Sequence, residues 1–256
     1  MQISWLTYTA IQFIWTFIGL IAFLWLLFRE TAPYGRHIRQ GYGITINNRL
    51  GWVLMETPVM IWLLLFFQMS GNDDGQSGIV YLFIGLFLLH YIHRSFIFPV
   101  FLRTKGKFMP LAIVLMALLF NMVNGFGLGY YFGHFADYPN DWHSSWQFIL
   151  GIGLFFCGIC INIYSDYRLI GLRKQGDTSY HIPRGGLFEY ISCPNLMGEL
   201  IEWGGFALMT WCLPGFVFWF WSMANLVPRA LAHHRWYHQH FADYPKQRKA
   251  VIPFLL

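Results

Sequence analysis

Seven long apolar segments dominate this chain and leave few ways for it to fold. They span residues 5–28, 51–69, 79–102, 108–133, 146–167, 195–212 and 214–232. Each is close to the roughly 20 apolar residues that a helix needs to cross a bilayer. Only 11% of the residues are charged, against about 25% in soluble domains. Because a backbone in lipid must satisfy its own hydrogen bonds, we expect an all-α, polytopic membrane protein with a bundle of seven transmembrane helices.

The placement of the basic residues predicts how this bundle is oriented. All 17 Lys and Arg residues lie in or next to the connections 29–50, 103–107 and 168–194 and the tail from 233, whereas the N-terminus, 70–78 and 134–145 contain none. Cytosolic segments retain Lys and Arg, so we expect the N-terminus outside and the C-terminus in the cytosol. The same rule explains the net charge of +5 without a nucleic-acid partner, because no basic run alternates with exposed aromatic residues.

Helices that share one core favour a single domain over residues 1–256. One short repeat, His-Phe-Ala-Asp-Tyr-Pro, occurs at 134–139 and at 240–245. We interpret it as a helix exit in which the proline ends the element. The run Gly125-Phe-Gly-Leu-Gly129 follows no strand, so it fails the context of a dinucleotide fingerprint and predicts close packing of its helix.

Three polar side chains in the second and third segments are candidates for chemistry, since ionisable residues within a membrane span are costly and usually functional. Glu56 either fixes a helix contact or takes part in binding or catalysis. Tyr91 is either an ordinary core aromatic or, in a dry pocket beside a carboxylate, a donor to a substrate oxygen. Arg94 shares a helix face with His90, and it can also reach water by snorkelling.

Further polar residues gather at the cytosolic third of the bundle, in the fifth to seventh segments and their connections. Arginine suits phosphates, Asp suits ribose hydroxyls and aromatic rings suit base stacking, so this set favours a polyanionic nucleotide. The set comprises Asn162, Asp166, Arg173, Tyr180, His181, Arg184, Asn195, Glu199, Glu202, Arg229, His233, His234, Arg235 and Tyr237. A metal site is the competing interpretation for the histidines from His233 to His240, but their spacing fits no standard motif and we expect no metal. These residues alone indicate a membrane enzyme or transporter with a cytosolic polyanion site.

Seven ordered blocks of sequence resemble the steroid 5-alpha-reductase family, the 3-oxo-5-alpha-steroid 4-dehydrogenases. The resemblance runs from about residue 34 to the C-terminus and is closer to the steroid enzymes than to polyprenol or enoyl-CoA reductases. The blocks are Tyr34-Gly-Arg-His37, Glu56-Thr-Pro58, Leu89-His-Tyr-Ile-His-Arg-Ser-Phe96, Asn162-Ile-Tyr-Ser-Asp-Tyr167, Tyr180-His-Ile-Pro-Arg-Gly-Gly-Leu-Phe188, Gly198-Glu-Leu-Ile-Glu-Trp203 and Asp243-Tyr-Pro-Lys-Gln-Arg-Lys-Ala-Val-Ile-Pro-Phe254.

The resemblance implies NADPH-dependent reduction of the C4–C5 double bond of a 3-oxo-Δ4-steroid, with hydride delivered to C5. It implies that Tyr91 polarises the C3 oxygen together with Glu56, and that Trp52, Met55 and Trp203 border the substrate. The cofactor residues that it implies lie mainly within 162–256; they are Tyr34, Arg94, Asn162, Asp166, Arg173, Tyr180, Asn195, Glu199, Glu202, His233 and Tyr237.

Three departures from the family pattern bear on specificity. Met55 stands where the family often has Gln, and His181 where an Arg is usual. The loop 102–108 also differs, so no role is carried over to it. The alternatives are an NADPH-dependent reductase of a polyprenol or other lipid enone, a membrane methyltransferase and, ranked below them, a proton-coupled transporter. We expect a monomer in a bacterial inner membrane or the endoplasmic reticulum, with its active site open to the cytosol.

Overall fold

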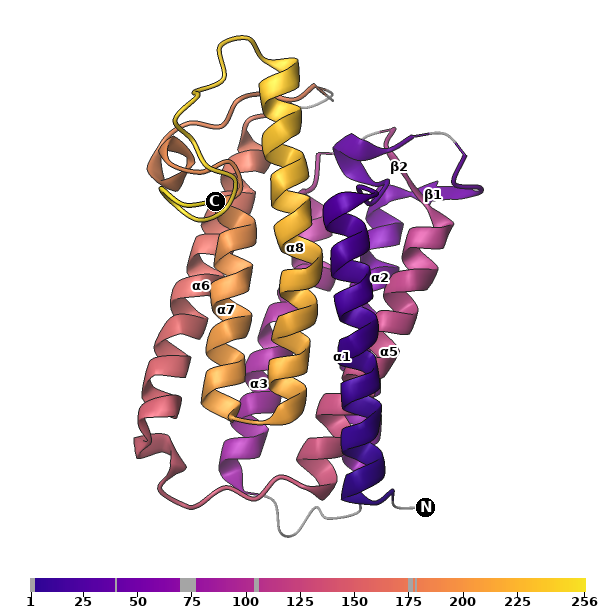
Figure 1. Cartoon of the computed structure of the whole chain (residues 1–256), viewed down its shortest axis with the longest axis vertical. Helices are drawn as coiled ribbons and strands as arrows, with labels where there is room; N and C mark the ends of the chain where they lie inside the picture. The colour runs from indigo at the N-terminus through magenta and orange to yellow at the C-terminus, as the bar shows by residue number, and fades with distance from the viewer. Residues whose placement is uncertain (1–2, 40, 70–76, 104–105, 175–176, 178) are drawn as a thin grey trace.

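The computed structural model describes residues 3–39, 41–69, 77–103, 106–174, 177 and 179–256. Each of the seven predicted segments forms one long helical stretch of a single bundle (Figure 1). The helices are α1 (Trp5–Phe28), α2 (Asn48–Gln68), α3 (Gly78–Ile92), α4 (Phe98–Phe101), α5 (Leu111–His134), α6 (Trp146–Gly171), α7 (Pro194–Thr210) and α8 (Leu213–His240). A π-helical turn, His93–Ile97, joins α3 to α4, so these two helices and the turn form the third stretch.

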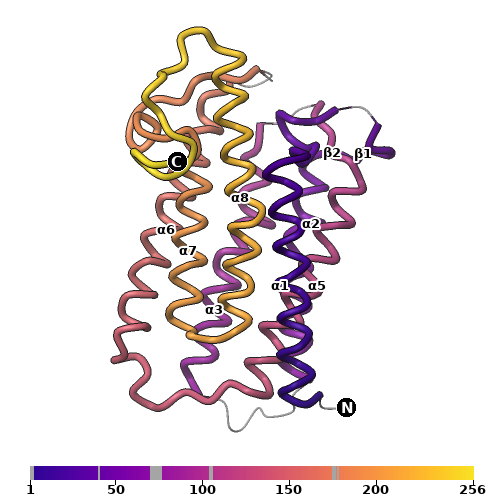
Figure 2. The backbone as a smooth tube through the Cα atoms, in the orientation of Figure 1, coloured from indigo at the N-terminus to yellow at the C-terminus, as the bar shows by residue number. Residues whose placement is uncertain are grey.

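The long helices alternate in direction along the bundle. The connections that follow α1, α4 and α6 lie at the same end as the C-terminal tail, and the N-terminus lies at the opposite end (Figures 1 and 2). The predicted basic connections therefore share one end of the molecule. This is the arrangement that an odd number of alternating helical stretches produces.

In the part of the chain that the structure describes, five helical stretches are long and apolar enough to cross a membrane: Trp5–Phe28, Asn48–Gln68, Gly78–Phe101, Leu111–His134 and Trp146–Gly171. Their outward faces carry large exposed apolar side chains, such as Phe13 on α1, Ile61 on α2 and Met116 on α5. Exposed apolar surface of this extent is typical of contact with lipid, because soluble monomers rarely carry it. These features are those of an integral membrane protein. They confirm the prediction that the chain is predominantly helical.

Two predicted boundaries are wrong in the same way. α6 continues to Gly171 and α8 to His240, whereas the apolar segments end at 167 and 232. His233, His234 and Tyr237 therefore lie on a helix and not in a tail. Hydropathy detects the part of a helix that suits lipid, but the backbone remains helical into the polar region because its hydrogen bonds are internal.

The structure also contains a two-stranded antiparallel sheet, which the all-α prediction does not include. β1 (Thr45–Asn47) pairs with β2 (Phe108–Pro110), with Ile46 opposite Met109. It ties the connection before α2 to the one before α5, at the same end as the C-terminal tail (Figure 1).

Glycines set the two closest helix contacts. A Cβ on Gly125 of α5 would lie 2.6 Å from the Trp62 Cβ of α2, which confirms the close packing predicted for this run. α6 and α7 approach each other at two levels. There, Gly151 faces Gly205 and Gly158 faces Gly198, each meeting the carbonyl oxygen of the other. The second level lies one turn from Asn162 and Glu202, so it sets the distance between the polar side chains of the two helices.

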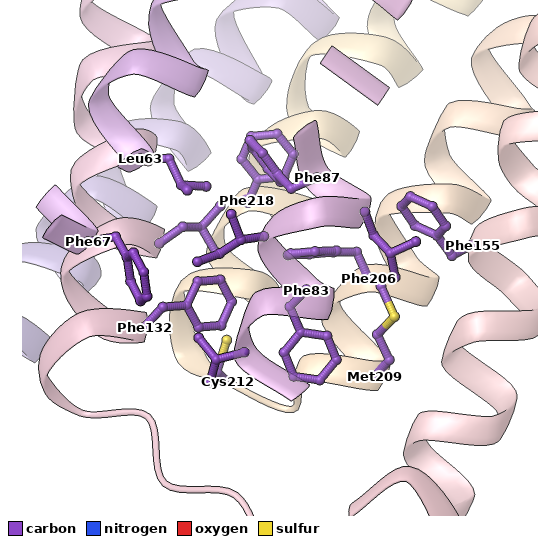
Figure 3. Close-up of a cluster of buried hydrophobic side chains, with 14 of the residues drawn as sticks. Leu63, Phe67, Phe83, Phe87, Phe132, Phe155, Phe206, Met209, Cys212 and Phe218 are labelled. Atoms are coloured by element: carbon purple, nitrogen blue, oxygen red, sulfur yellow. The ribbon is translucent and has the colours of Figure 1, made fainter. Parts of the chain in front are cut away.

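An aromatic core surrounds α3 (Figure 3). Phe83 and Phe87 of α3 are fully buried and share one cluster with Phe132, Phe206 and Phe218 of α5, α7 and α8. In the most apolar part of the stretch Gly78–Phe101, half of the residues are buried inside the bundle, whereas the corresponding share in α1 is 11%. α3 is therefore the central helix of the bundle, and the residues that follow Phe87 enter its interior.

The two copies of the repeat both begin at the last residue of a helix, His134 or His240. The interpretation as a helix exit is correct, but the proline stands five residues later and does not end the helix. In both copies the tyrosine is buried and docks at an end of α7. The Tyr138 hydroxyl donates to the Thr210 carbonyl oxygen at 2.6 Å, and the Tyr244 hydroxyl lies 2.7 Å from Ser192 Oγ.

Candidate active site

Arg94 is the centre of a buried polar network. The π-helical turn that carries it adds one residue to the helical repeat, a feature common at functional sites. The Arg94 guanidinium donates to Asp166 of α6 at 2.6 Å and lies 3.6 Å from a Glu199 oxygen of α7. The residue is 8% exposed, so the alternative that it snorkels into water is wrong.

Two asparagines complete this network. Asn195 donates to the second oxygen of Asp166 at 2.9 Å, and Asn162 donates to the Asn195 carbonyl at 2.9 Å. Asn162 also lies 3.5 Å from Glu199. The structure thus brings together five predicted cofactor residues from three helical stretches: Arg94, Asn162, Asp166, Asn195 and Glu199.

Trp52 covers the other face of Arg94. The guanidinium lies 5.0 Å from the Trp52 ring and 4.7 Å from the Phe98 ring, and these two rings meet edge to face at 5.6 Å. Such cation–π contacts stabilise a buried guanidinium most when water is excluded. α2, which also carries Glu56, is therefore tied to the network through Trp52.

Glu56 and Tyr91 face the same interior region. The Tyr91 hydroxyl lies within electrostatic range of Glu56, Glu199 and Glu202, and Glu56 lies within range of Arg94 and Glu199. The Tyr91 side chain is 5% exposed. A phenol and a carboxylate from two helices thus interact electrostatically in the interior of the bundle.

Trp203 packs next to Tyr91 in this region. Its ring lies 4.6 Å from His90, 5.8 Å from Tyr91 and 4.7 Å from Phe218. Met55, in contrast, packs with Met109, Ile113 and Val114 in a separate cluster on the α5 side. The structure therefore places Trp203 beside Tyr91. It places Met55 in the separate cluster against α5.

Sequence reasoning missed two residues of this region. His90 Nδ1 lies 2.7 Å from Glu202 Oε1, with both side chains buried, and the other Glu202 oxygen has no partner among the described residues. The available signal was that His90 and Arg94 lie four residues apart. Asn121 of α5 donates to the Met55 carbonyl, directly before Glu56 in the chain. An isolated Asn in an apolar segment gives no indication of its partner.

A cleft with about 160 Å³ of space extends from this network toward the basic end of the bundle. Asp166 lines the cleft together with three other predicted cofactor residues, Arg173, Tyr180 and Tyr237. Its lining also includes Arg36, Arg103 and His181. His181 pairs with Asp177 at 2.8 Å. The cleft thus joins the network around Arg94 to a second group of basic and aromatic residues.

The last two predicted cofactor residues lie beside this second group. The Arg229 guanidinium stacks on the Tyr34 ring at 3.7 Å and donates to the Tyr34 carbonyl at 2.9 Å. His233 Nδ1 lies 2.9 Å from His37 Nε2, with the rings stacked. Burial, followed by the charge of Arg229 and then of Arg36, lowers the pKa of His37 to about 3. The surroundings are thus strongly positive.

The residues of the cleft fit a dinucleotide phosphate. Arg36 Nη1 is buried and has no hydrogen-bond partner among the described residues, so a donor is available for an anion. Among the described residues that line the cleft, Asp166 is the only carboxylate, and it is already bonded to Arg94. Carboxylate-poor, cationic surroundings with aromatic rings suit phosphates and a planar base.

The chain is similar to proteins of one family over most of its length. A family model described as 3-oxo-5-alpha-steroid 4-dehydrogenase matches residues 107–256. The chain is 44% identical over 229 residues to steroid 5-alpha-reductase DET2 of Gossypium hirsutum, with 88% of each chain covered. It is 42% identical over 228 residues to 3-oxo-5-alpha-steroid 4-dehydrogenase 1 of Homo sapiens, with 89% of this chain and 88% of the relative covered. The protein of the same description from Mus musculus is 41% identical over 249 residues, with 96% of both covered.

Proposed function

The chain belongs to the 3-oxo-5-alpha-steroid 4-dehydrogenase family of steroid 5-alpha-reductases, and we propose that it reduces the C4–C5 double bond of a 3-oxo-Δ4-steroid with NADPH. The observation that carries this proposal is the electrostatic proximity of Glu56 and Tyr91 to each other and to Arg94 in the interior of the bundle. The apolar rings around Tyr91 suit a steroid, and a phenol beside a carboxylate suits its 3-oxo group.

In this proposal Tyr91 donates a hydrogen bond to the C3 oxygen. Reduction at C5 moves negative charge onto that oxygen, and a donor aimed at developing charge lowers the barrier most where water is excluded. Glu56 orients the phenol and the carbonyl from the facing helix. Trp203 holds the flat substrate from the α7 side, and Trp52 and Met55 border the α2 side. NADPH, when bound, supplies the hydride to C5.

The cofactor would lie along the cleft. Arg94, Asn162, Asp166, Asn195 and Glu199 would hold its middle part, and Glu202 the part nearest Tyr91. The basic end would be held by Tyr34, Arg173, Tyr180, His233 and Tyr237. The cofactor-binding part is then mainly 162–256 of a single domain. The pre-formed bonds of the Arg94 network fix these side chains before any ligand binds.

We further propose seven membrane crossings, with the basic end of the bundle in the cytosol and the N-terminus outside. The shared end of the connections after α1, α4 and α6 supports this orientation, since cytosolic segments retain Lys and Arg. Reporter fusions to each terminus measure it: a phosphatase that is active only outside should work at the N-terminus alone. Activity of that reporter at the C-terminus would reverse the orientation. We also propose that the monomer is the functional unit.

The decisive experiment incubates the purified protein with NADPH and testosterone or progesterone. Loss of NADPH absorbance and a product two mass units heavier are expected, whereas turnover of a polyprenol alone would favour the lipid-enone reductase. Tyr91→Phe and Glu56→Gln should each lower kcat by about 10²-fold or more, in line with the loss of one oxyanion donor. Tyr81→Phe, on the exposed face of the same helix, is the matched control. Near-normal rates in both variants would remove the proposed pair, and binding of S-adenosylmethionine in place of NADPH would favour a methyltransferase.

A further inference from the structure

Four basic residues without a carboxylate partner gather at the far end of the cleft. Arg36, Arg103 and Arg173 line it, and Lys107 donates to the Tyr180 hydroxyl at 3.2 Å. Of the ion pairs formed within the described part of the chain, none includes any of these four residues. They come from three separate connections of the bundle, so the fold, and not local sequence, brings them together. Like charges held this close repel each other unless an anion lies between them.

Arg36 is the most enclosed of the four. Its guanidinium carbon lies 5.0 Å from the ring of Tyr180, 4.9 Å from that of Trp236 and 4.5 Å from that of Tyr237. These three rings hold the guanidinium plane, while Nη1 is buried without a hydrogen-bond partner in the described residues. A buried, unpaired donor on a cation is unfavourable. The side chain is therefore pre-organised for a ligand that supplies oxygen acceptors and negative charge.

The position of Arg36 separates it from the reacting end of the site. Arg94 acts electrostatically on both Glu56 and Tyr91, whereas Arg36 acts on His37 and His233. A dinucleotide with its nicotinamide beside Tyr91 would extend past Arg94 and place its adenosine at the Arg36 end. Aromatic rings beside an arginine fork suit an adenine base next to a phosphate monoester.

Resting on the proposed function, we infer that Arg36 binds the phosphate on the adenosine 2′ oxygen and is the residue by which the enzyme selects NADPH over NADH. The planar guanidinium offers two parallel donors to that phosphate, and NADH has only a hydroxyl there. Arg103, Arg173 and Lys107 add positive charge around the same point. The selection is a binding step, so it is measurable without turnover.

The test measures equilibrium binding to the purified full-length protein by quenching of tryptophan fluorescence. The probes are NADPH, NADH and 2′,5′-ADP, which carries the 2′-phosphate but no nicotinamide. Arg36→Met should weaken NADPH and 2′,5′-ADP by about 10- to 100-fold, the range of a lost charged hydrogen bond, and leave NADH within about twofold. Arg36→Lys keeps the charge and should recover part of the loss. Arg39→Met is the control, because Arg39 lies exposed on the same connection and pairs with Glu30.

Each other outcome overturns the inference. An equal loss for NADPH and NADH would place Arg36 at the diphosphate or in a structural role, and unchanged NADPH affinity would remove it from the site. Retained NADH binding shows that the variant is folded. The wild-type arm tests the proposed function separately: if wild-type protein binds none of the three probes, the NADPH-dependent function itself fails, before any variant is compared.

Discussion

Replacement of Gly158 by Ala tests whether the contact between α6 and α7 holds the candidate site together. A Cβ at this position would lie 2.5 Å from the Gly198 carbonyl oxygen and would also overlap the backbone at Glu202. Ordinary contact begins at 3.4 Å and the Glu202 backbone nitrogen is nearer than the Gly198 oxygen, so the helices must separate by at least about 0.9 Å. Both obstacles are backbone atoms within helices, which cannot rotate away as a side chain can.

The expected loss of stability follows from this overlap. Overpacking a well-packed interface by one methyl group costs about 1–3 kcal/mol. For a chain of this size, that corresponds to a Tm lower by roughly 2–12 °C. The separation also acts on function, because Asn162 and Asn195 are joined across the same interface at 2.9 Å. A misplacement of about 1 Å in positioning groups can lower turnover by about 10²-fold.

Thermal unfolding of the purified protein, followed by a thiol-reactive dye, measures the first effect, and the rate of NADPH oxidation with a 3-oxo-Δ4-steroid measures the second. Gly153→Ala is the control on the same helix, since a Cβ there would meet nothing within 4 Å. We expect Gly153→Ala to match the wild type in both assays. A Gly158→Ala protein with the same Tm and turnover rate as this control would refute the argument that the glycine contact sets the site.

Three further predictions concern single side chains. Tyr138→Phe removes the donor to the Thr210 carbonyl and should lower the free energy of unfolding by about 1–3 kcal/mol, measured as Tm; an unchanged Tm would show that the repeat does not anchor α7. Asp166→Ala leaves Arg94 with one distant carboxylate and should cost about 3–5 kcal/mol, whereas Asp166→Asn, which still accepts from Arg94, should cost less; equal losses would contradict the ion-pair argument. The pKa of His37 is lowered to about 3 in the folded chain. This side chain therefore takes up a proton near pH 6.5 only when the chain is unfolded. Stability should therefore fall as pH drops from 6.5 toward 3, by up to roughly 1.4 kcal/mol per unit. His37→Gln should reduce this slope between pH 6.5 and 5, and an unaltered slope would assign the sensitivity to other groups.

The helices could be predicted from sequence because the bilayer imposes a length and a composition on each of them. Predictions failed where other forces decide. The polar last turns of α8, up to His240, carry no hydropathy signal, and the pairing of Thr45–Asn47 with Phe108–Pro110 depends on segments about 60 residues apart. The glycines of α6 and α7 stand seven residues apart in each helix, but only the fold shows that Gly151 meets Gly205 and Gly158 meets Gly198.

For the site, the sequence supplied the candidate side chains one by one but not their partners. Arg94 is an example. Because it lies near a helix end, the sequence is equally compatible with an ion pair inside the bundle and with a side chain that reaches water. The packing of α6 against α7 decides which of the two occurs. Their glycine contact brings Asp166 and Glu199 close enough to compensate the charge of the Arg94 guanidinium. The fold pairs His90 with Glu202 in the same way. A buried charge is stable only with its partners in place, so the packing of small residues between two helices determines which polar residues form the site.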